Sequence, residues 1–279
     1  IPLSEKTLCI PYDLNFCRPV IGPMPYLIIS LAAFLASGLT LFSGFGLGTL
    51  LLPVMALFFP IDLAIALTAV VHALNNLFKF WLLGRHADQG VVVKFGLPAI
   101  LSALAGAWVL LWLAEIPPLL TYPVWGREAQ VTPVKLVVAV LMAVFALVEM
   151  APGGARFSLP PRYLPLGGIL SGFFGGLSGH QGALRSPFLL KAGLTKESYI
   201  ATGVVISLMV DIPRIIIYGL SLRGLYLEGN HGLLTAAVLA AFSGAWLGNR
   251  LLKKVTLRMV QLLVAGMLLA IAVALGSGL

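Results

Sequence analysis

The amino-acid sequence predicts an all-α polytopic membrane protein, built from two inverted repeats of about five helices each. Hydrophobic residues make up 59% of its 279 residues, and charged residues make up only 10%. A soluble domain carries about 25% charged residues, so this balance indicates a chain that lies mostly in a lipid bilayer. The evidence for two repeats is a sequence motif that occurs twice.

The duplicated motif is a glycine-rich break inside apolar sequence, at residues 43–53 and again at 178–187. When the two breaks are aligned, further residues coincide: Pro53 with Pro187, Gly48 with Gly182, and Thr68 with Thr202. A Gly-Ala-Trp triplet at 106–108 recurs at 244–246. We therefore expect short, glycine-broken helices from the two repeats to meet near the membrane midplane.

The domain boundaries follow from the alternation of apolar and proline-rich sequence. The expected parts are an irregular extracytoplasmic N-terminal arm at 1–24, a first transmembrane repeat at 25–151, a linker at 152–162, and a second transmembrane repeat at 163–279. The arm contains four prolines, and the linker contains the breakers Pro152-Gly153-Gly154 and Pro160-Pro161. Neither segment is apolar enough to span a membrane.

Ten helices are predicted within the repeats, or fewer if a short helix merges with its neighbour. They cover residues 25–42, 46–59, 60–83, 91–113 and 133–150 in the first repeat, and 163–177, 181–190, 196–220, 232–252 and 257–275 in the second. Pro60 and Asp62 favour the first turn of the third helix. Residues 85–90 are polar and predict a loop, and the prolines within 114–132 predict the longest interior loop.

The distribution of basic residues among the predicted loops tests the orientation of the chain in the membrane. If the N-terminus is outside, the cytoplasmic loops hold ten basic residues: Arg85, Lys94, Arg156, Arg162, Lys191, Lys196, Arg250, Lys253, Lys254 and Arg258. The outside then holds five: Lys6, Arg18, Arg127, Lys135 and Arg223. Because basic residues concentrate in cytoplasmic loops, we expect both termini outside a bacterial cytoplasmic (inner) membrane. The net charge of +8 is explained in the same way, without a nucleic-acid partner; a homodimer is compatible with the sequence.

The two cysteines, Cys9 and Cys17, both lie in the N-terminal arm. They are compatible with a disulfide if the arm is extracytoplasmic, and equally with two free thiols. No Cys-x-x-Cys pair or Cys/His cluster indicates a metal site, and no phosphate-binding loop of the Gly-x-x-x-x-Gly-Lys-Ser/Thr type is present. We therefore expect neither a metal nor another cofactor.

Three basic residues fall inside the predicted membrane: Lys79, Arg185 and Arg214. A cation at the bilayer centre costs about 2.5–3.5 kcal/mol, so such residues usually face a cavity or a partner. Polar residues share a face on two helices: His72, Asn75, Asn76 and Lys79 on one, and Ser207, Asp211 and Arg214 on the other. The two stripes occupy nearly equivalent positions of the two repeats.

These features favour an anion site at the midplane. The glycines expected to unwind the chain and free backbone N–H groups are Gly44, Gly46, Gly179 and Gly182, with Ser43 beside the first break. Helix N-termini carry partial positive charge and bind anions. Arg185 follows the second break directly, and His180 and Gln181 add hydrogen-bond donors there.

Each feature has a structural alternative. The glycines could serve only close helix packing, and Lys79 could extend to the cytoplasmic interface. Asp211 and Arg214 could simply pair with each other, and His72 could be a hydrogen-bonded core residue. Arg185 is the hardest of these residues to explain without a ligand, because it lies in a short helix directly after a glycine break.

The sequence resembles the TauE/SafE family (also called TSUP) of sulfite and organosulfonate permeases. The resemblance rests on Ser-Gly-Phe-Gly-x-Gly-x-x-x-x-Pro at 43–53, Pro-Ile-Asp-x-Ala-x-Ala-x-Thr at 60–68, and Gly-Ala-Trp, and it covers nearly the whole chain. Phe45 and Leu47 interrupt a glycine run that is usually longer in the family, and His180 and Gln181 make the second break more polar. The resemblance implies transport, without ATP, of a small sulfur-containing or carboxylated anion.

The leading hypothesis is a secondary transporter that works by alternating access. Arg185 and Arg214 would hold the anion, Lys79 would assist electrostatically, and Asn75, Asn76, His180 and Gln181 would supply neutral hydrogen bonds. His72 or Asp211 would couple transport to protons, because an imidazole and a buried carboxyl can both titrate near neutral pH. The alternatives are an intramembrane enzyme, for which no catalytic motif is present, and a passive anion channel.

Overall fold

The structure is a computed structural model that describes residues 8–9, 17–18, 23–43, 46–124, 127–150, 158–221, 231–251 and 257–278. Side chains are described for most of these residues, but not for the N-terminal strands or for Ser43. Gly44 of the first glycine break lies outside the described residues.

The described chain is dominated by helices, and all ten predicted helices are confirmed. Their bounds are α1 (Pro23–Ser43), α2 (Leu47–Ala56), α3 (Ile61–Leu83), α4 (Gln89–Glu115), α5 (Pro133–Met150), α6 (Leu164–Ser178), α7 (Gln181–Leu189), α8 (Lys196–Ser221), α9 (His231–Leu251) and α10 (Leu257–Gly276). Short 3₁₀ turns, η1 (Gly84–His86) and η3 (Pro161–Tyr163), precede α4 and α6. Most helix ends lie within two residues of the predicted ones, because proline, glycine and polar side chains interrupt the apolar runs there.

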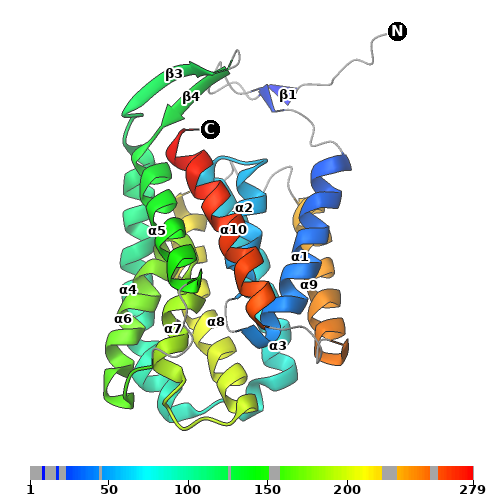
Figure 1. Cartoon of the computed structure of the whole chain (residues 1–279), viewed down its shortest axis with the longest axis vertical. Helices are drawn as coiled ribbons and strands as arrows, with labels where there is room; N and C mark the ends of the chain where they lie inside the picture. Colours follow the sequence, from blue (N-terminus) through cyan, green and yellow to red (C-terminus); the bar gives the residue numbers. More distant parts are fainter. Residues whose placement is uncertain are drawn as a thin grey trace.

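Helix lengths match a membrane. Among the described residues α3, α4, α8 and α9 are long and apolar enough to cross it, and α1, α2, α5 and α10 contribute shorter apolar segments. The 27 residues of α4 extend about 40 Å, more than the roughly 30 Å apolar layer of a bilayer. By contrast, α2 with 10 residues and α7 with 9 reach only about 15 Å. Figure 1 shows α2 toward one end of the molecule and α7 toward the other.

The two halves pack reciprocally. Helix α4 lies against α6, and α1 lies against α9 in the same way, while α3 packs on α8 and α5 on α10. A Cβ at Gly106 of α4 would lie 2.0 Å from the carbonyl oxygen of Phe173, and a Cβ at Gly244 of α9 would lie 2.1 Å from that of Phe34. The glycines of the repeated Gly-Ala-Trp triplet therefore allow the same close helix approach in each half.

A second glycine series, which the sequence analysis did not predict, allows close contact between α4 and α6. Gly168, Gly172 and Gly176 are spaced four residues apart on α6, and a Cβ at any of them would lie within 2.3 Å of an α4 backbone oxygen. This spacing is the small-xxx-small pattern of membrane helix pairs. For these glycines close packing is the observed role.

The long interior loop predicted at 114–132 contains a β-hairpin that the sequence analysis did not predict. Strands β3 (Leu120–Val124) and β4 (Arg127–Val131) form an antiparallel hairpin in which Leu120 pairs with Val131. Threonine, tyrosine and valine favour strands, and Pro123 is tolerated because a two-stranded hairpin has an unpaired edge. The backbone N–H of Gln130 donates to the carbonyl oxygen of Gly278 at 3.1 Å, which attaches the hairpin to the end of α10.

The N-terminal arm is also not entirely irregular. Strands β1 (Leu8–Cys9) and β2 (Cys17–Arg18) pair antiparallel, with Leu8 opposite Arg18 and Cys9 opposite Cys17. Proline content alone did not predict this short pairing, because the residues that pair lie between the prolines.

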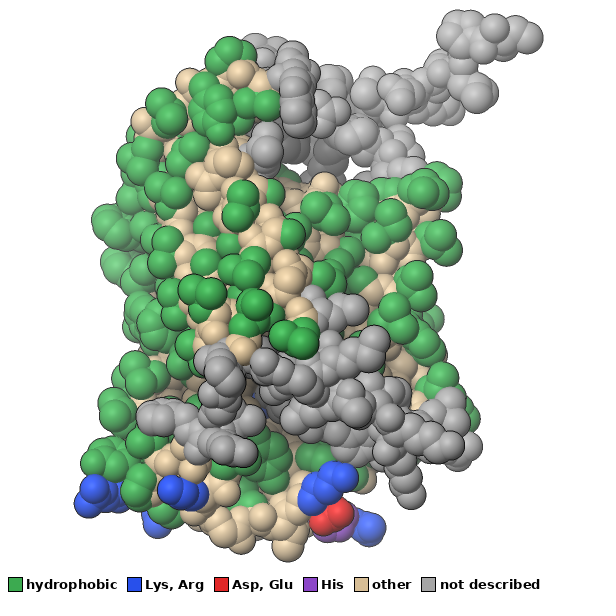
Figure 2. Space-filling model, in the orientation of Figure 1, with side chains coloured by type: hydrophobic (Ala, Val, Ile, Leu, Met, Phe, Trp, Pro, Cys, Tyr) green, Lys and Arg blue, Asp and Glu red, His purple; other side chains and the backbone are tan. Residues whose placement is uncertain are grey.

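The surface separates an apolar belt from a charged end. In Figure 2 hydrophobic side chains cover most of the visible helical surface, and Lys and Arg gather at the end opposite the β3–β4 hairpin. Exposed basic residues of the segments at that end are Arg85, Lys94, Arg162, Lys191 and Lys196. The start of α1 and the end of α10 lie at the other end, with the hairpin (Figure 1).

Candidate functional site

The two glycine breaks meet in the interior. Gly46, which precedes α2, has a φ of +82°, and Gly179, which ends α6, has a φ of +81°; L side chains rarely adopt this conformation. A Cβ at Gly48 would lie 3.6 Å from the carbonyl oxygen of Gly179, so the two breaks are neighbours. Neither α2 nor α7 has a side-chain cap at its N-terminus. Gly182, by contrast, lies within the first turn of α7, so the expectation that it unwinds the chain is wrong.

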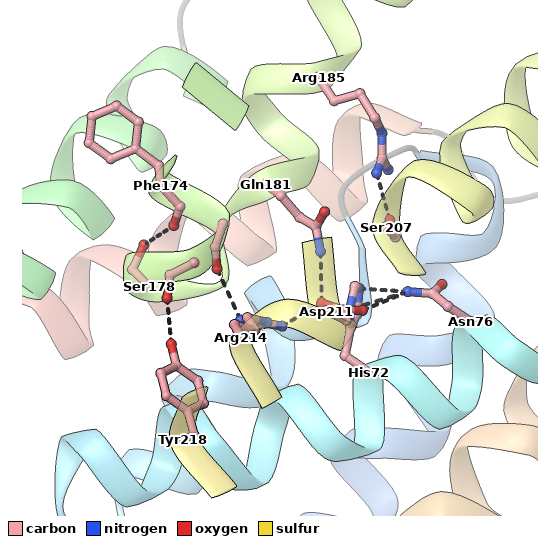
Figure 3. A network of polar contacts seen from close by, with 12 residues as sticks. His72, Asn76, Phe174, Ser178, Gln181, Arg185, Ser207, Asp211, Arg214 and Tyr218 are labelled. Carbon is pink, nitrogen blue, oxygen red and sulfur yellow. Dashed lines mark hydrogen bonds and ion pairs between the residues drawn. The ribbon is translucent and has the colours of Figure 1, made fainter. Parts of the chain in front are cut away.

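A buried cluster around Asp211 lies beside these breaks (Figure 3). The Asp211 carboxylate is fully buried and accepts hydrogen bonds on both oxygens. The donors and donor–acceptor distances are His72 Nδ1 at 2.6 Å, Arg214 Nη2 at 2.7 Å, Gln181 Nε2 at 2.9 Å and Asn76 Nδ2 at 3.4 Å. These residues come from α3, α7 and α8, so one carboxylate joins helices of both halves.

The predicted stripe on α3 is buried throughout, but its members have different neighbours. His72 and Asn76 face Asp211, and a Cβ at Gly46 would lie 3.1 Å from the His72 Nε2 atom. The Asn75 side-chain amide oxygen (Oδ1) instead accepts a hydrogen bond from the Ser37 hydroxyl of α1 at 2.9 Å. Lys79 is only 3% exposed, so it does not extend to the cytoplasmic interface.

Arg214 is held on two sides. Its guanidinium pairs with Asp211, and its Nη1 donates to the carbonyl oxygen of Gly175 at 3.1 Å. Four residues along α8, the Tyr218 hydroxyl donates to the carbonyl oxygen of Gly176. The alternative in which Asp211 and Arg214 pair is therefore observed, and the pair fastens α8 to the end of α6.

Arg185 lies apart from this cluster. It is 6% exposed, and its Nη1 donates to the Ser207 hydroxyl at 2.5 Å (Figure 3). A Cβ at Gly203 would lie 3.5 Å from its guanidinium, so Arg185 rests against α8 at a position without a side chain. Helices α3 and α8 run antiparallel side by side, because His72 contacts Asp211 and the backbone N–H after α3, at Asp88, donates to the Thr202 hydroxyl at 2.9 Å. Lys79 on α3 and Ser207 on α8 both lie between these two contacts, which places the Lys79 ammonium on the same stretch of the interface as the Arg185 guanidinium.

The buried charges do not balance. Among the described residues the buried cations are Lys79, Arg185 and Arg214, whereas the only buried carboxylate is that of Asp211. Within the same part of the chain, Asp211 forms both buried ion pairs, with His72 and Arg214. Neither Lys79 nor Arg185 forms an ion pair with a described carboxylate.

His180 is buried against α5 rather than within the Asp211 cluster. Its ring stacks on that of Phe145 with centroids 5.4 Å apart, and its Nδ1 lies 3.1 Å from the Ser178 hydroxyl. The Nε2 of His180 and the side-chain amide oxygen (Oε1) of Gln181 are buried without a hydrogen-bond partner among the described residues. Both atoms therefore remain free to bind a water or a ligand group.

Sequence reasoning did not assign a site role to Ser207, Tyr218 or Phe145. Ser207 was part of the α8 stripe, and Tyr218 continues that stripe one turn beyond Arg214, so helical spacing could have indicated both. Phe145 lies in a uniformly apolar helix, and only the packing of α5 reveals its contact with His180. No group of three His, Cys, Asp or Glu side chains suited to a metal ion occurs within the described ranges.

The geometry thus combines helix breaks of both halves with buried positive charge in an apolar, membrane-sized bundle. No curated protein matches the chain. The family model described as the sulfite exporter TauE/SafE matches residues 29–275, which confirms the resemblance seen in the sequence. The chain is an integral membrane protein, and it belongs to the TauE/SafE family.

Proposed function

We propose that the protein is a secondary active transporter that moves a small sulfur-containing anion, such as sulfite, sulfoacetate or another sulfonate, by alternating access. Membership of the TauE/SafE family implies transport of sulfite or related sulfur anions across a membrane. A transporter needs a binding site in the interior, between two helix sets that can move against each other. The reciprocal packing of the two halves around the glycine breaks supports such a site.

The observation that carries the proposal is the excess of buried positive charge. Each isolated ion costs several kcal/mol to bury, and three cations beside one carboxylate leave a net positive charge that an anion would compensate. The cations are Lys79, Arg185 and Arg214, and the neutral groups assigned to the site are Asn75, Asn76, His180 and Gln181. Backbone N–H groups at the glycine breaks, from Ser43, Gly44 and Gly46 to Gly179 and Gly182, complete the proposed lining.

Proton coupling would act through the His72–Asp211 pair. A 2.6 Å contact joins the His72 Nδ1 to the carboxylate, so a proton added at the imidazole changes the charge of a group shared by α3 and α8. The His72 Nε2 faces Gly46, at the start of α2. Protonation of His72 would therefore change the electrostatic environment of Gly46, before α2 in the first half, and of Asp211, on α8 in the second half.

The orientation proposed places the basic end in the cytoplasm of a bacterial cell. Positive residues concentrate on the cytoplasmic side of membrane proteins, and the exposed lysines and arginines gather opposite the hairpin. The β3–β4 hairpin and the end of α10 would then face outward. The odd number of helices in each half supports an inverted insertion of the second half, which is part of this proposal.

The test is flux in proteoliposomes containing the purified full chain. We expect uptake of sulfite or sulfoacetate that a pH gradient accelerates, loss of uptake in Arg185→Gln, and unchanged uptake in the matched surface variant Arg85→Gln. Absence of flux for every sulfur anion would refute the proposal. Conductance far above carrier rates would indicate a channel, and chemical turnover in detergent, without two compartments, would indicate an enzyme.

A further inference from the structure

The buried charges divide into a balanced part and an unbalanced part. Asp211 and Arg214 are in contact at 2.7 Å, and both are at most 1% exposed, so their opposite charges compensate. All four donors around the Asp211 carboxylate come from the protein itself. This cluster therefore holds helices together, and among its charged groups only the Arg214 Nε lacks a hydrogen-bond partner.

The unbalanced part consists of Arg185 and Lys79. The Arg185 guanidinium has five N–H donors, and the described residues accept one of them, through Ser207. The Lys79 ammonium donates no hydrogen bond to a described residue, although it is 3% exposed. Asp211 is in contact with Arg214 at 2.7 Å, and no described carboxylate forms an ion pair with Arg185 or Lys79.

From this charge distribution we infer that the preferred substrate is a dianion bound between Arg185 and Lys79, and that Arg214 positions helices rather than binding the anion. The inference rests on the proposed transport function and narrows its substrate class. Two like charges held together in a low-dielectric interior repel each other strongly. A ligand with two negative charges removes this repulsion and neutralises both cations, whereas a monoanion leaves one buried charge unmatched.

The helices that contribute these groups fit the inference. Lys79 comes from α3, Arg185 from α7, and Ser207, which fixes the guanidinium, from α8. Helices α3 and α8 also pack on each other. A dianion would thus bind where α3 of the first half meets α7 and α8 of the second, so its binding is coupled to the fit between the halves.

The experiment compares the binding of two similar sulfonates to the purified full chain by calorimetry. Sulfoacetate carries two negative charges, and 2-hydroxyethanesulfonate replaces its carboxylate with a neutral alcohol. We expect the wild type to bind sulfoacetate at least about tenfold more tightly, a difference of about 1.4 kcal/mol. Lys79→Met should reduce this preference to near unity, and Arg185→Gln should weaken the binding of both compounds.

Three variants control for folding and charge. Lys79→Arg keeps the charge and should keep a preference for sulfoacetate. Lys94→Met removes an exposed lysine at the basic end of the molecule and should leave the binding of both compounds unchanged. Arg214→Gln should lower thermal stability while retaining the preference for sulfoacetate. Equal binding of the two compounds by the wild type would overturn the dianion inference and leave the proposed transport function standing. A preference that survives in Lys79→Met would overturn the role of Lys79. No binding of either compound, nor of sulfite, by a folded wild type would overturn the proposed function and the inference with it.

Discussion

Replacing Asp211 with asparagine tests the central cluster most directly. The carboxylate accepts hydrogen bonds from His72, Asn76, Gln181 and Arg214 and is fully buried. An asparagine keeps the shape but offers one acceptor oxygen and turns an NH₂ group toward other donors. Removing one partner of a buried ion pair costs about 3–5 kcal/mol, because the other charge stays buried without compensation. At about 2–4 °C per kcal/mol for a chain of this size, the apparent unfolding midpoint should fall by roughly 6–20 °C.

The assay is thermal unfolding of the purified protein in one detergent at one scan rate, because such transitions are often irreversible. Glu197→Gln is the matched control: it removes an exposed carboxylate from the same helix, and we expect less than about 0.5 kcal/mol of change. The double variant Asp211→Asn/Arg214→Gln removes both charges and should be more stable than the sum of the single losses predicts. A midpoint in Asp211→Asn within about 2 °C of the wild type would refute the structural role of the cluster.

Three further predictions concern the backbone and the N-terminal arm. Gly106→Ala should lower the free energy of unfolding by about 1–3 kcal/mol, since its Cβ would lie 2.0 Å from an α6 carbonyl oxygen. Gly219→Ala, where a Cβ meets open space, should be neutral or slightly stabilising in the same thermal assay. Equal effects of the two substitutions would contradict the close packing of α4 on α6. Gly179→Ala should cost about 1–2 kcal/mol because of its φ of +81°, and an unchanged midpoint would contradict a required left-handed turn. Cys9 and Cys17 lie opposite each other in β1 and β2, so we expect mass spectrometry of protein isolated without reductant to find them joined by a disulfide; two alkylated thiols would contradict an oxidised arm.

The helices were predictable because a membrane leaves the chain few options. In the bilayer, backbone N–H and C=O groups must form hydrogen bonds within their own segment, so long apolar runs become helices. Proline, glycine and charged residues mark the ends of these helices. The hairpin at Leu120–Val124 and Arg127–Val131 lies at the end of the bundle, beyond the long apolar helices, and there the same proline-rich composition fits a loop or a hairpin. Its attachment to Gly278 is a contact between distant parts of the chain that local sequence does not encode.

The sequence predicted which residues form the candidate site, but not which of them contact each other. Helical spacing correctly placed His72, Asn76 and Lys79 on the buried side of α3. It did not show that Asp211 of the other half would accept a hydrogen bond from His72, or that Asn75 would turn to Ser37 instead. Residues one position apart on a helix point about 100° apart, so neighbours in sequence meet different partners once the helices pack.

By itself, the sequence determined the membrane class, the helix boundaries, the duplicated breaks and the family, because these depend on composition, periodicity and local motifs. The tertiary structure alone decided which charges compensate each other. Spacing on one helix made an Asp211–Arg214 pair one alternative, and the structure shows that it forms. That Arg185 would contact Ser207, on the stretch of α8 that lies beside Lys79 of α3, depends on packing between helices and was not encoded locally. The strength of an electrostatic interaction depends on distance and burial, and both are set by how α3, α7 and α8 pack together.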